Sequence, residues 1–147
     1  MAQFDRGNDM KEKHDYLFEA LSGVLESCYK QEDWISASET LQSMAEHLMK
    51  EHKYRDALKC QMLSFYFSVS GIMTSPYIDE DLVASAKEAY RLSGMNETEM
   101  TLMYFDAIRS DTLPKHSLTL KGSFRVWTYC LYEKHRKLEE ILNNLPN

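Results

Sequence analysis

Apolar residues recur at spacings of three and four along most of the chain, which is the period of an amphipathic α-helix. The first three such stripes cover residues 17–28, 34–48 and 54–69. From Leu63 to Val69 the third stripe is apolar on nearly every face, a pattern typical of a helix in the middle of a bundle. Its low content of β-branched residues argues against a strand. The pattern therefore predicts three consecutive helices, of which the third is central.

Turn and capping residues mark two further helices. Gly71 is expected to end the third helix, and the acidic residues 79–81 place negative charge at the positive end of a fourth. Gly94 is the expected C-terminal cap of that helix. Asn96, followed three residues later by Glu99, is a capping-box pattern that opens a fifth helix.

One long helix, from Ser123 to Leu145, is predicted after a connection at residues 111–122. Its apolar residues recur at offsets of three, four and seven, and this stripe includes Trp127, which is therefore expected in the core. Residues 1–10 are expected to be flexible. The chain is thus predicted to be a single helical domain, residues 1–147, of the all-α class, with about six helices in a bundle or short solenoid.

Two of the predicted connections have similar sequences. The segments Lys30–Ala37 and Lys50–Ala57 each contain a Lys, an aromatic residue four positions later and an Ala three positions after that. The aromatic side chain can pack on the preceding helix, while the small Ala lets two backbones approach. Over residues 38–70, about one repeat, the chain resembles the tetratricopeptide-repeat (TPR) family at Met44, Ala45, Leu48, Tyr54 and Ala57. The resemblance implies a stack of helical hairpins of a kind often used to bind other proteins.

The chain also departs from the TPR pattern at identifiable positions. Gln61 and Ser64 occupy the family's later aromatic and Ala positions. A Lys and Asn clamp for a peptide carboxylate would need those two residues where this chain has Gln42 and Glu46. That particular specificity is therefore not expected here.

Composition and charge narrow the possible partners. The 147 residues include 5 Gly and 3 Pro, too few for a turn-rich β-fold, and the net charge of -6 disfavours general nucleic-acid binding. The charge is uneven, because the C-terminal part is basic through Lys115, Lys121, Arg125, Lys134, Arg136 and Lys137. Such asymmetry fits a phosphate-binding face or, more strongly, an intramolecular or intersubunit complement to the acidic part.

No motif predicts catalysis or a bound cofactor. Cys28, Cys60 and Cys130 are far apart, as expected for buried free thiols rather than a disulfide framework or zinc site. His47 and Glu51 lie one helical turn apart beside His52, but a zinc site needs three or four converging ligands, so no metal is predicted. The carboxylates at 79–81 and 139–140 suit a helix start and a helix face, and a Gly-rich phosphate loop is missing. We therefore expect neither an enzyme nor a cofactor.

The aromatic and methionine content is high, with nine Met, nine Tyr and six Phe. Several of them lie outside the main apolar stripes, namely Phe67, Met73, Tyr77, Tyr104 and Tyr132. Such residues either fill an irregular helical core or supply an adaptable protein interface, and the sequence favours neither reading.

The expected function is non-enzymatic protein binding by an adaptor, inhibitor or regulator, in the cytoplasm of a bacterium or encoded by a phage. We expect no membrane-spanning segment. We also expect the protein to associate with itself. A nucleic-acid-binding regulator that uses the basic C-terminal helix is the alternative, and an enzyme whose site is not visible in sequence is the third. The candidate partner-binding residues are Phe67, Tyr77, Tyr104, Tyr132, Lys134, Arg136 and Lys137.

Overall fold

The computed structural model describes residues 5–71, 80–110, 120–132 and 136–145, which contain seven α-helices and no strand. The predicted all-α class is confirmed. The helices are α1 (Asp5–Gln31), α2 (Trp34–Lys50), α3 (Tyr54–Gly71), α4 (Glu80–Ser93), α5 (Glu97–Ser110), α6 (Leu120–Leu131) and α7 (Arg136–Asn144).

The prediction of one long C-terminal helix is wrong. Its apolar stripe is divided between α6, which packs on α3, α4 and α5, and α7, which packs on α5. Leu131 and Leu138 are seven residues apart, a spacing that fits one continuous helix. The positions between them on that face, 134 and 135, are not apolar. The two parts of the stripe can therefore pack on different helices. Both leucines are buried. The connection predicted at 111–122 lies mostly outside the described residues, and α6 already begins at Leu120.

Helices α2 and α3 form the most closely packed pair of the molecule. Ala37 and Ala57, at the start of each helix, are completely buried, as expected where two backbones approach. Directly after Ala37, the hydroxyl of Ser38 donates to the carbonyl of Ser64 at 2.8 Å, and the hydroxyl of Ser64 donates back to the carbonyl of Ser38 at 2.9 Å. Small and hydrogen-bonded residues therefore join the two helices along their contact.

The α1–α2 and α2–α3 turns have the same backbone structure. Glu32 and His52 adopt left-handed φ angles of 56° and 61°. In each turn, the N–H of the following residue donates to the carbonyl five positions earlier, from Asp33 to Cys28 and from Lys53 to Leu48, both at 2.9 Å. This pattern closes a helix C-terminus with main-chain bonds alone. The similarity expected from the two sequences is therefore confirmed in the structure.

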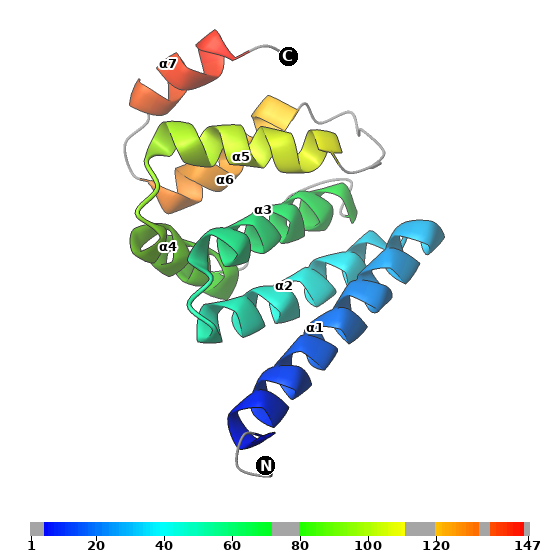
Figure 1. Ribbon diagram of the computed structural model, residues 1–147. Coiled ribbons are helices and arrows are strands. Elements are labelled where there is room, and N and C mark those ends of the chain that lie inside the picture. Colours follow the sequence, from blue (N-terminus) through cyan, green and yellow to red (C-terminus); the bar gives the residue numbers. More distant parts are fainter. Residues whose placement is uncertain (1–4, 72–79, 111–119, 133–135, 146–147) are drawn as a thin grey trace.

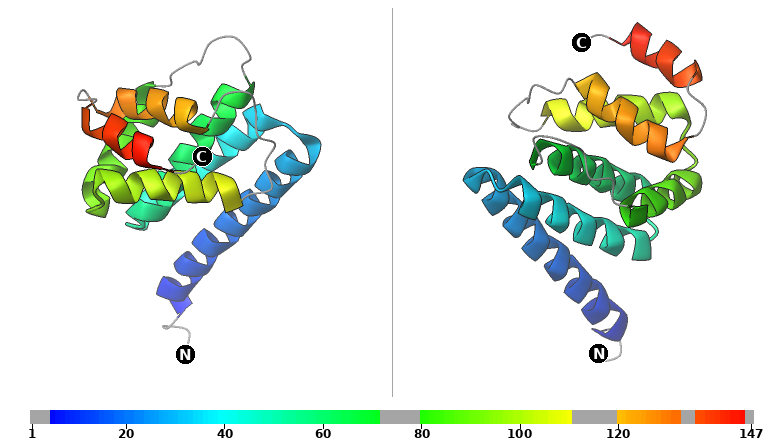
Figure 2. Two further views of the ribbon diagram at one scale, coloured as in Figure 1. Left: turned by 90° about the horizontal axis from the view of Figure 1, so that it is seen from above. Right: turned by 180° about the vertical axis from the view of Figure 1, so that it is seen from behind.

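The helices are arranged as a stack in which each one contacts near neighbours in the chain (Figure 1). Helix α1 packs on α2, while α3 lies between α2 on one side and α4 and α5 on the other. Helix α7 lies over α5 at the far end of the stack (Figure 1). The views in Figure 2 show the N-terminal half of α1 extending away from the other helices.

Aromatic side chains fill the part of the core between α3, α5 and α6. Trp127 and Tyr104 are completely buried, and their rings stack with centroids 6.3 Å apart. Phe124 lies 4.7 Å from Tyr104, and Phe65 lies 6.5 Å from Trp127, measured between ring centroids. The core position predicted for Trp127 is confirmed.

Candidate functional site

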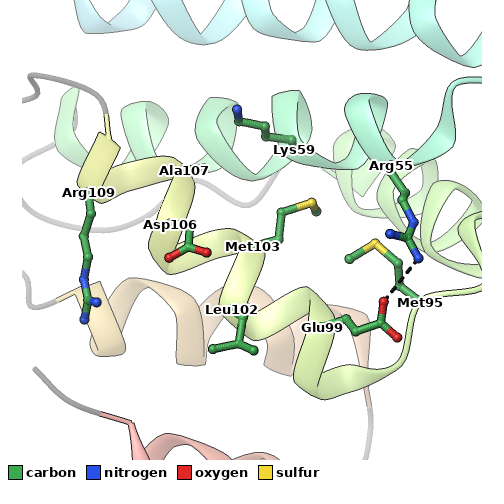
Figure 3. Close-up of a pocket in the computed structure, with 9 residues that line it drawn as sticks. All are labelled: Arg55, Lys59, Met95, Glu99, Leu102, Met103, Asp106, Ala107 and Arg109. Atoms are coloured by element: carbon green, nitrogen blue, oxygen red, sulfur yellow. Dashed lines mark hydrogen bonds and ion pairs between the residues drawn. The ribbon is translucent and has the colours of Figure 1, made fainter.

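An open groove with a volume of about 700 Å³ lies between α3 and α5. Helix α3 contributes Arg55 and Lys59, and the rest of the lining comes from Met95 and one side of α5. Figure 3 shows Met95 and Met103 between the two helices, with charged side chains around them. The groove thus combines an apolar floor with a charged rim.

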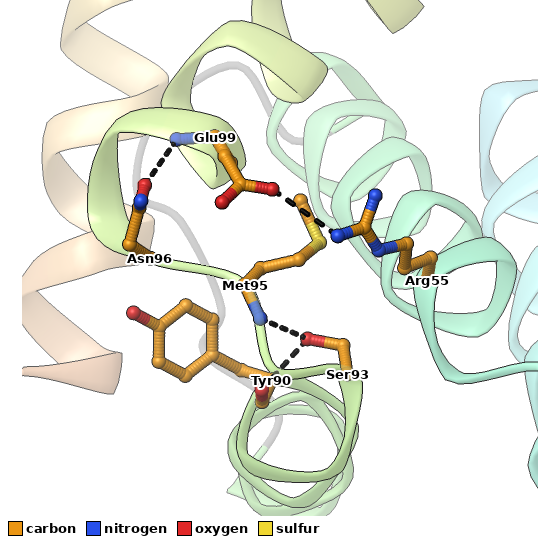
Figure 4. Close-up of polar contacts among 6 residues, drawn as sticks. All are labelled: Arg55, Tyr90, Ser93, Met95, Asn96 and Glu99. Carbon is orange, nitrogen blue, oxygen red and sulfur yellow. Dashed lines mark hydrogen bonds and ion pairs between the residues drawn. The ribbon is translucent and has the colours of Figure 1, made fainter.

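The α4–α5 turn positions one end of this groove (Figure 4). Gly94 takes a left-handed φ of 71°, and the N–H of Met95 donates to the hydroxyl of Ser93 at 3.2 Å. Asn96 caps α5, because its side-chain oxygen accepts the N–H of Glu99 at 2.8 Å. The predicted cap at Asn96 is therefore confirmed.

The capping box is only half formed, because the carboxylate of Glu99 does not turn back to Asn96. It instead accepts a hydrogen bond from the guanidinium of Arg55 on α3 at 3.2 Å. Both side chains are largely exposed, so this ion pair contributes little to stability. Its effect is to connect the two walls of the α3–α5 groove at the rim.

A second groove lies between α1 and α3, over α2, with a volume of about 390 Å³. Its apolar floor includes Leu41, Met44 and Leu63. Lys59 lines this groove as well as the α3–α5 groove and is exposed. The two grooves therefore lie on either side of α3 and share a cation at their common edge.

The second groove contains a buried cysteine thiol. Burial, reinforced by the nearby carboxylate of Asp56, raises the pKa of the Cys60 thiol in the second groove to about 12. A thiol with that pKa is protonated at neutral pH and is a poor nucleophile. Among the described residues, no three His, Cys, Asp or Glu side chains come together as a metal site would require.

The structure places Phe67 and Tyr104 in the core, although both were candidate partner-binding residues. Phe67 is 1% exposed and stacks on Trp34 with ring centroids 5.2 Å apart. Tyr104 is 0% exposed, its hydroxyl lies 2.7 Å from that of Ser123, and burial raises its pKa. Neither side chain is available to a partner in this structure, so the core reading of these two aromatics is the correct one.

The other candidates are dispersed. Tyr132 is half-buried, its hydroxyl donates to the sulfur of Met100 at 3.8 Å, and burial raises its pKa. Arg136 and Lys137 are exposed on α7, away from both grooves. Tyr77 and Lys134, like Met73, lie outside the described residues.

The histidines considered as metal ligands lie in different surroundings. His47 is buried, with its Nε2 3.4 Å from a carboxylate oxygen of Glu51, and its ring stacks on Phe18. His52 is exposed, and its Nδ1 lies 2.6 Å from the hydroxyl of Tyr54. The first histidine thus belongs to the α1–α2 contact and the second to the turn before α3.

Sequence reasoning missed the residues that line the α3–α5 groove. Arg55 and Glu99 are 44 positions apart, and no local pattern connects them. Leu102 is 46% exposed on α5, one turn after Glu99. The one available signal was the capping motif at Asn96, which fixes where α5 begins and therefore which of its residues turn toward α3.

Comparison with protein-family models, with curated proteins and with solved structures found no match to this chain. Of the helices that the structure describes, none combines the length and the apolar character that a membrane span requires. Function is therefore inferred from the grooves themselves.

Proposed function

We propose that this protein binds another protein without catalysing a reaction, and that the partner occupies the α3–α5 groove. The observation that carries the proposal is the composition of this groove. It has a volume of about 700 Å³, an apolar floor and charged residues at its edges. Protein-binding surfaces commonly have such an apolar centre and polar rim. The fitting partner is a segment that presents an apolar stripe with flanking charges.

A TPR-like stack of helical hairpins is part of this proposal. The matching hydrogen-bond pattern of the turns at Glu32 and His52 supports it, as do the buried Ala37 and Ala57. Successive hairpins that stack in one direction leave grooves between alternate helices, and here such grooves lie on either side of α3.

Nucleic-acid binding has less support. Trp127, an aromatic residue of the basic C-terminal part, is completely buried and cannot stack on a base. Of this basic part, the structure describes three exposed cations, Arg125 on α6 and Arg136 and Lys137 on α7. Three such cations on two helices form a small electrostatic footprint on a chain of net charge -6.

Affinity capture from native host cells with tagged parent protein and tagged variants tests the proposal. Leu102→Glu and Lys59→Glu alter the groove at exposed positions, so both variants should fold and lose the captured protein. Ile35→Glu and Lys87→Glu are matched controls, exposed on α2 and α4 and outside both grooves, and should retain it.

With the captured protein purified, titration calorimetry should show affinity at least about tenfold weaker for Leu102→Glu than for Ile35→Glu. Equal affinities would exclude the α3–α5 groove as the binding site. Capture of only nucleic acid or a small metabolite would overturn protein binding itself.

A further inference from the structure

Lys59 lines both grooves because it lies on the part of α3 that separates them. Arg55 lines the α3–α5 groove on one side of this ridge, and Asp56 lines the second groove on the other. These three side chains are exposed, whereas residues 60–67, which follow directly, are all buried. A segment that passes from one groove to the other therefore crosses the first two turns of α3, beside Lys59.

The ammonium group of Lys59 is the available positive charge at this crossing. Lys53 pairs with Glu51 at 3.2 Å, and Arg55 pairs with Glu99 at 3.2 Å. Lys59 forms no ion pair with another residue that the structure describes. Because an ammonium group only donates hydrogen bonds and carries a full charge, the complementary group on a partner is a carboxylate.

Apolar surface lies on both sides of this cation. The second groove has Leu41, Met44 and Leu63 on its floor, and the α3–α5 groove has Leu102 and Met103. Their volumes of about 390 and 700 Å³ lie in the range of ligand pockets, so each can hold a large apolar side chain. The complementary segment therefore carries an apolar side chain, then an acidic one, then a second apolar one.

The width of α3 sets the spacing of these three side chains. A helix with its side chains is about 10–12 Å across, which is the distance that the segment must cover. An extended chain advances about 3.3 Å per residue and directs alternate side chains to one face, so residues four positions apart span about 13 Å. A helical segment is as wide and as straight as α3, so it would rest on the ridge without reaching both floors.

We propose that one extended segment of the partner protein occupies both grooves and crosses α3 at Lys59. One apolar side chain enters each groove, and a carboxylate midway between them accepts hydrogen bonds from the Lys59 ammonium group. This inference rests on the proposed function, because it uses the same α3–α5 groove. It adds the second groove and the chemistry of the partner.

Nuclear magnetic resonance of methyl-labelled methionines tests whether both grooves are occupied at once. The probe is the acetylated and amidated peptide Ser-Leu-Ser-Glu-Ser-Leu-Ser. We expect the methyl signals of Met44 in the second groove and Met103 in the α3–α5 groove to shift with one common dissociation constant. Met62 is 0% exposed and lines neither groove, so its signal should not shift. Replacing either leucine of the peptide with serine should weaken binding by about tenfold or more.

Charge substitutions on α3 test the role of Lys59. Lys59→Gln removes the attraction and should weaken binding of the peptide about threefold, whereas Asp56→Asn removes a like charge and should strengthen it by a similar factor. Lys87→Gln is the matched control, exposed on α4 and outside both grooves, and should bind like the parent. All these variants should bind equally to a peptide with glutamine in place of glutamate. Thermal melts establish that each variant is folded.

The proposal is overturned if the peptide does not saturate, if it shifts only one of Met44 and Met103, or if Lys59→Gln and Lys87→Gln bind it equally. A helix-forming peptide with leucines three and four residues apart that binds more tightly would also overturn it, and would indicate a helical partner. These outcomes are distinguishable from failure of the proposed function, which the capture experiment and the comparison of Leu102→Glu with Ile35→Glu test separately.

Discussion

Trp127 is the largest fully buried side chain among the described residues, enclosed by the aromatic core between α3, α5 and α6. Replacing it with alanine removes most of that volume, and we expect the free energy of unfolding to fall by about 3–5 kcal/mol. Tyr129→Ala, on the same helix but 63% exposed, should change it by no more than about 0.5 kcal/mol. Thermal and urea unfolding measure both values, and a Trp127→Ala variant as stable as the parent would contradict this packing.

Cys60 should make the protein less stable at alkaline pH. In the unfolded chain its thiol ionises near the ordinary value of 9.0, whereas in the folded protein its pKa is about 12. Above about pH 9 the unfolded chain therefore binds fewer protons, and stability falls by up to about 1.4 kcal/mol per pH unit until about pH 12. Below about pH 9 the thiol is protonated in both states and has no such effect.

Urea unfolding of the parent and of Cys60→Ala between about pH 8 and 11 measures this loss. The variant lacks the thiol and should lose less stability with rising pH, although Tyr104, whose pKa burial also raises, still contributes above about pH 10. If the two proteins show the same dependence on pH, the thiol does not titrate as burial implies.

At the scale of single residues, the sequence predicted burial at some positions and not at others. Helical periodicity was sufficient to predict the burial of Trp127. The apolar stripe that contains it must be buried, whichever helix packs against it. Phe67 and Tyr104 were ambiguous, since their burial depends on contacts with Trp34 on α2 and Ser123 on α6, which no local pattern indicates. The hydrogen bond from Gln61 on α3 to Ser85 on α4 joins residues 24 positions apart, so it too forms only in the folded chain.

At the scale of elements, the starts and ends of helices were largely predictable from capping chemistry. Gly94 follows the last residue of α4 with a left-handed φ, and Asn96 caps α5, as the sequence indicates. The separation of α6 from α7 was not predictable, because one stripe with offsets of three, four and seven fits one helix or two. Which alternative forms depends on packing, and α7 packs on α5 while α6 also reaches α3 and α4.

Helix α7 should open independently of the rest of the molecule. It has nine residues and is held on α5 through the buried Leu138 and Leu142. We expect Leu142→Ala to accelerate amide hydrogen exchange throughout α7 while leaving exchange in α2 and α3 unchanged. Equal acceleration in all three helices would show that α7 is part of one cooperative unit with the core.

The control for this experiment is the charge reversal Arg136→Glu/Lys137→Glu. Both side chains are exposed, so exchange in α7 should stay close to that of the parent. Overall stability should change by no more than about 0.5 kcal/mol. The comparison separates the apolar contacts of α7 from its surface charge.

The molecule as a whole should associate with itself. Leu17 and Val24 are 52% and 50% exposed, and they lie seven residues apart on α1, the first helix of the stack. Residues 1–111 also carry a net charge of -9 and residues 112–147 a net charge of +3, which favours contacts between copies that weaken with salt.

Light scattering at tens of micromolar protein, at low and high salt, should give a mass above the 17.2 kDa of one chain, with less association at high salt. Leu17→Glu/Val24→Glu should produce monomers. The control Ile35→Glu/Tyr129→Glu replaces two equally exposed apolar residues elsewhere and should behave as the parent. A parent that is monomeric under both conditions would exclude this association.

The main-chain closure of the α1–α2 and α2–α3 turns also has a consequence for how the protein is made. Both turns join helices that are adjacent in the chain, so little loop-closure entropy opposes their pairing. A ribosome releases residues 5–71 before it has synthesised α6 and α7. The α2–α3 hairpin, with its reciprocal serine bonds, can therefore assemble during translation and present a formed surface to each later helix as it emerges.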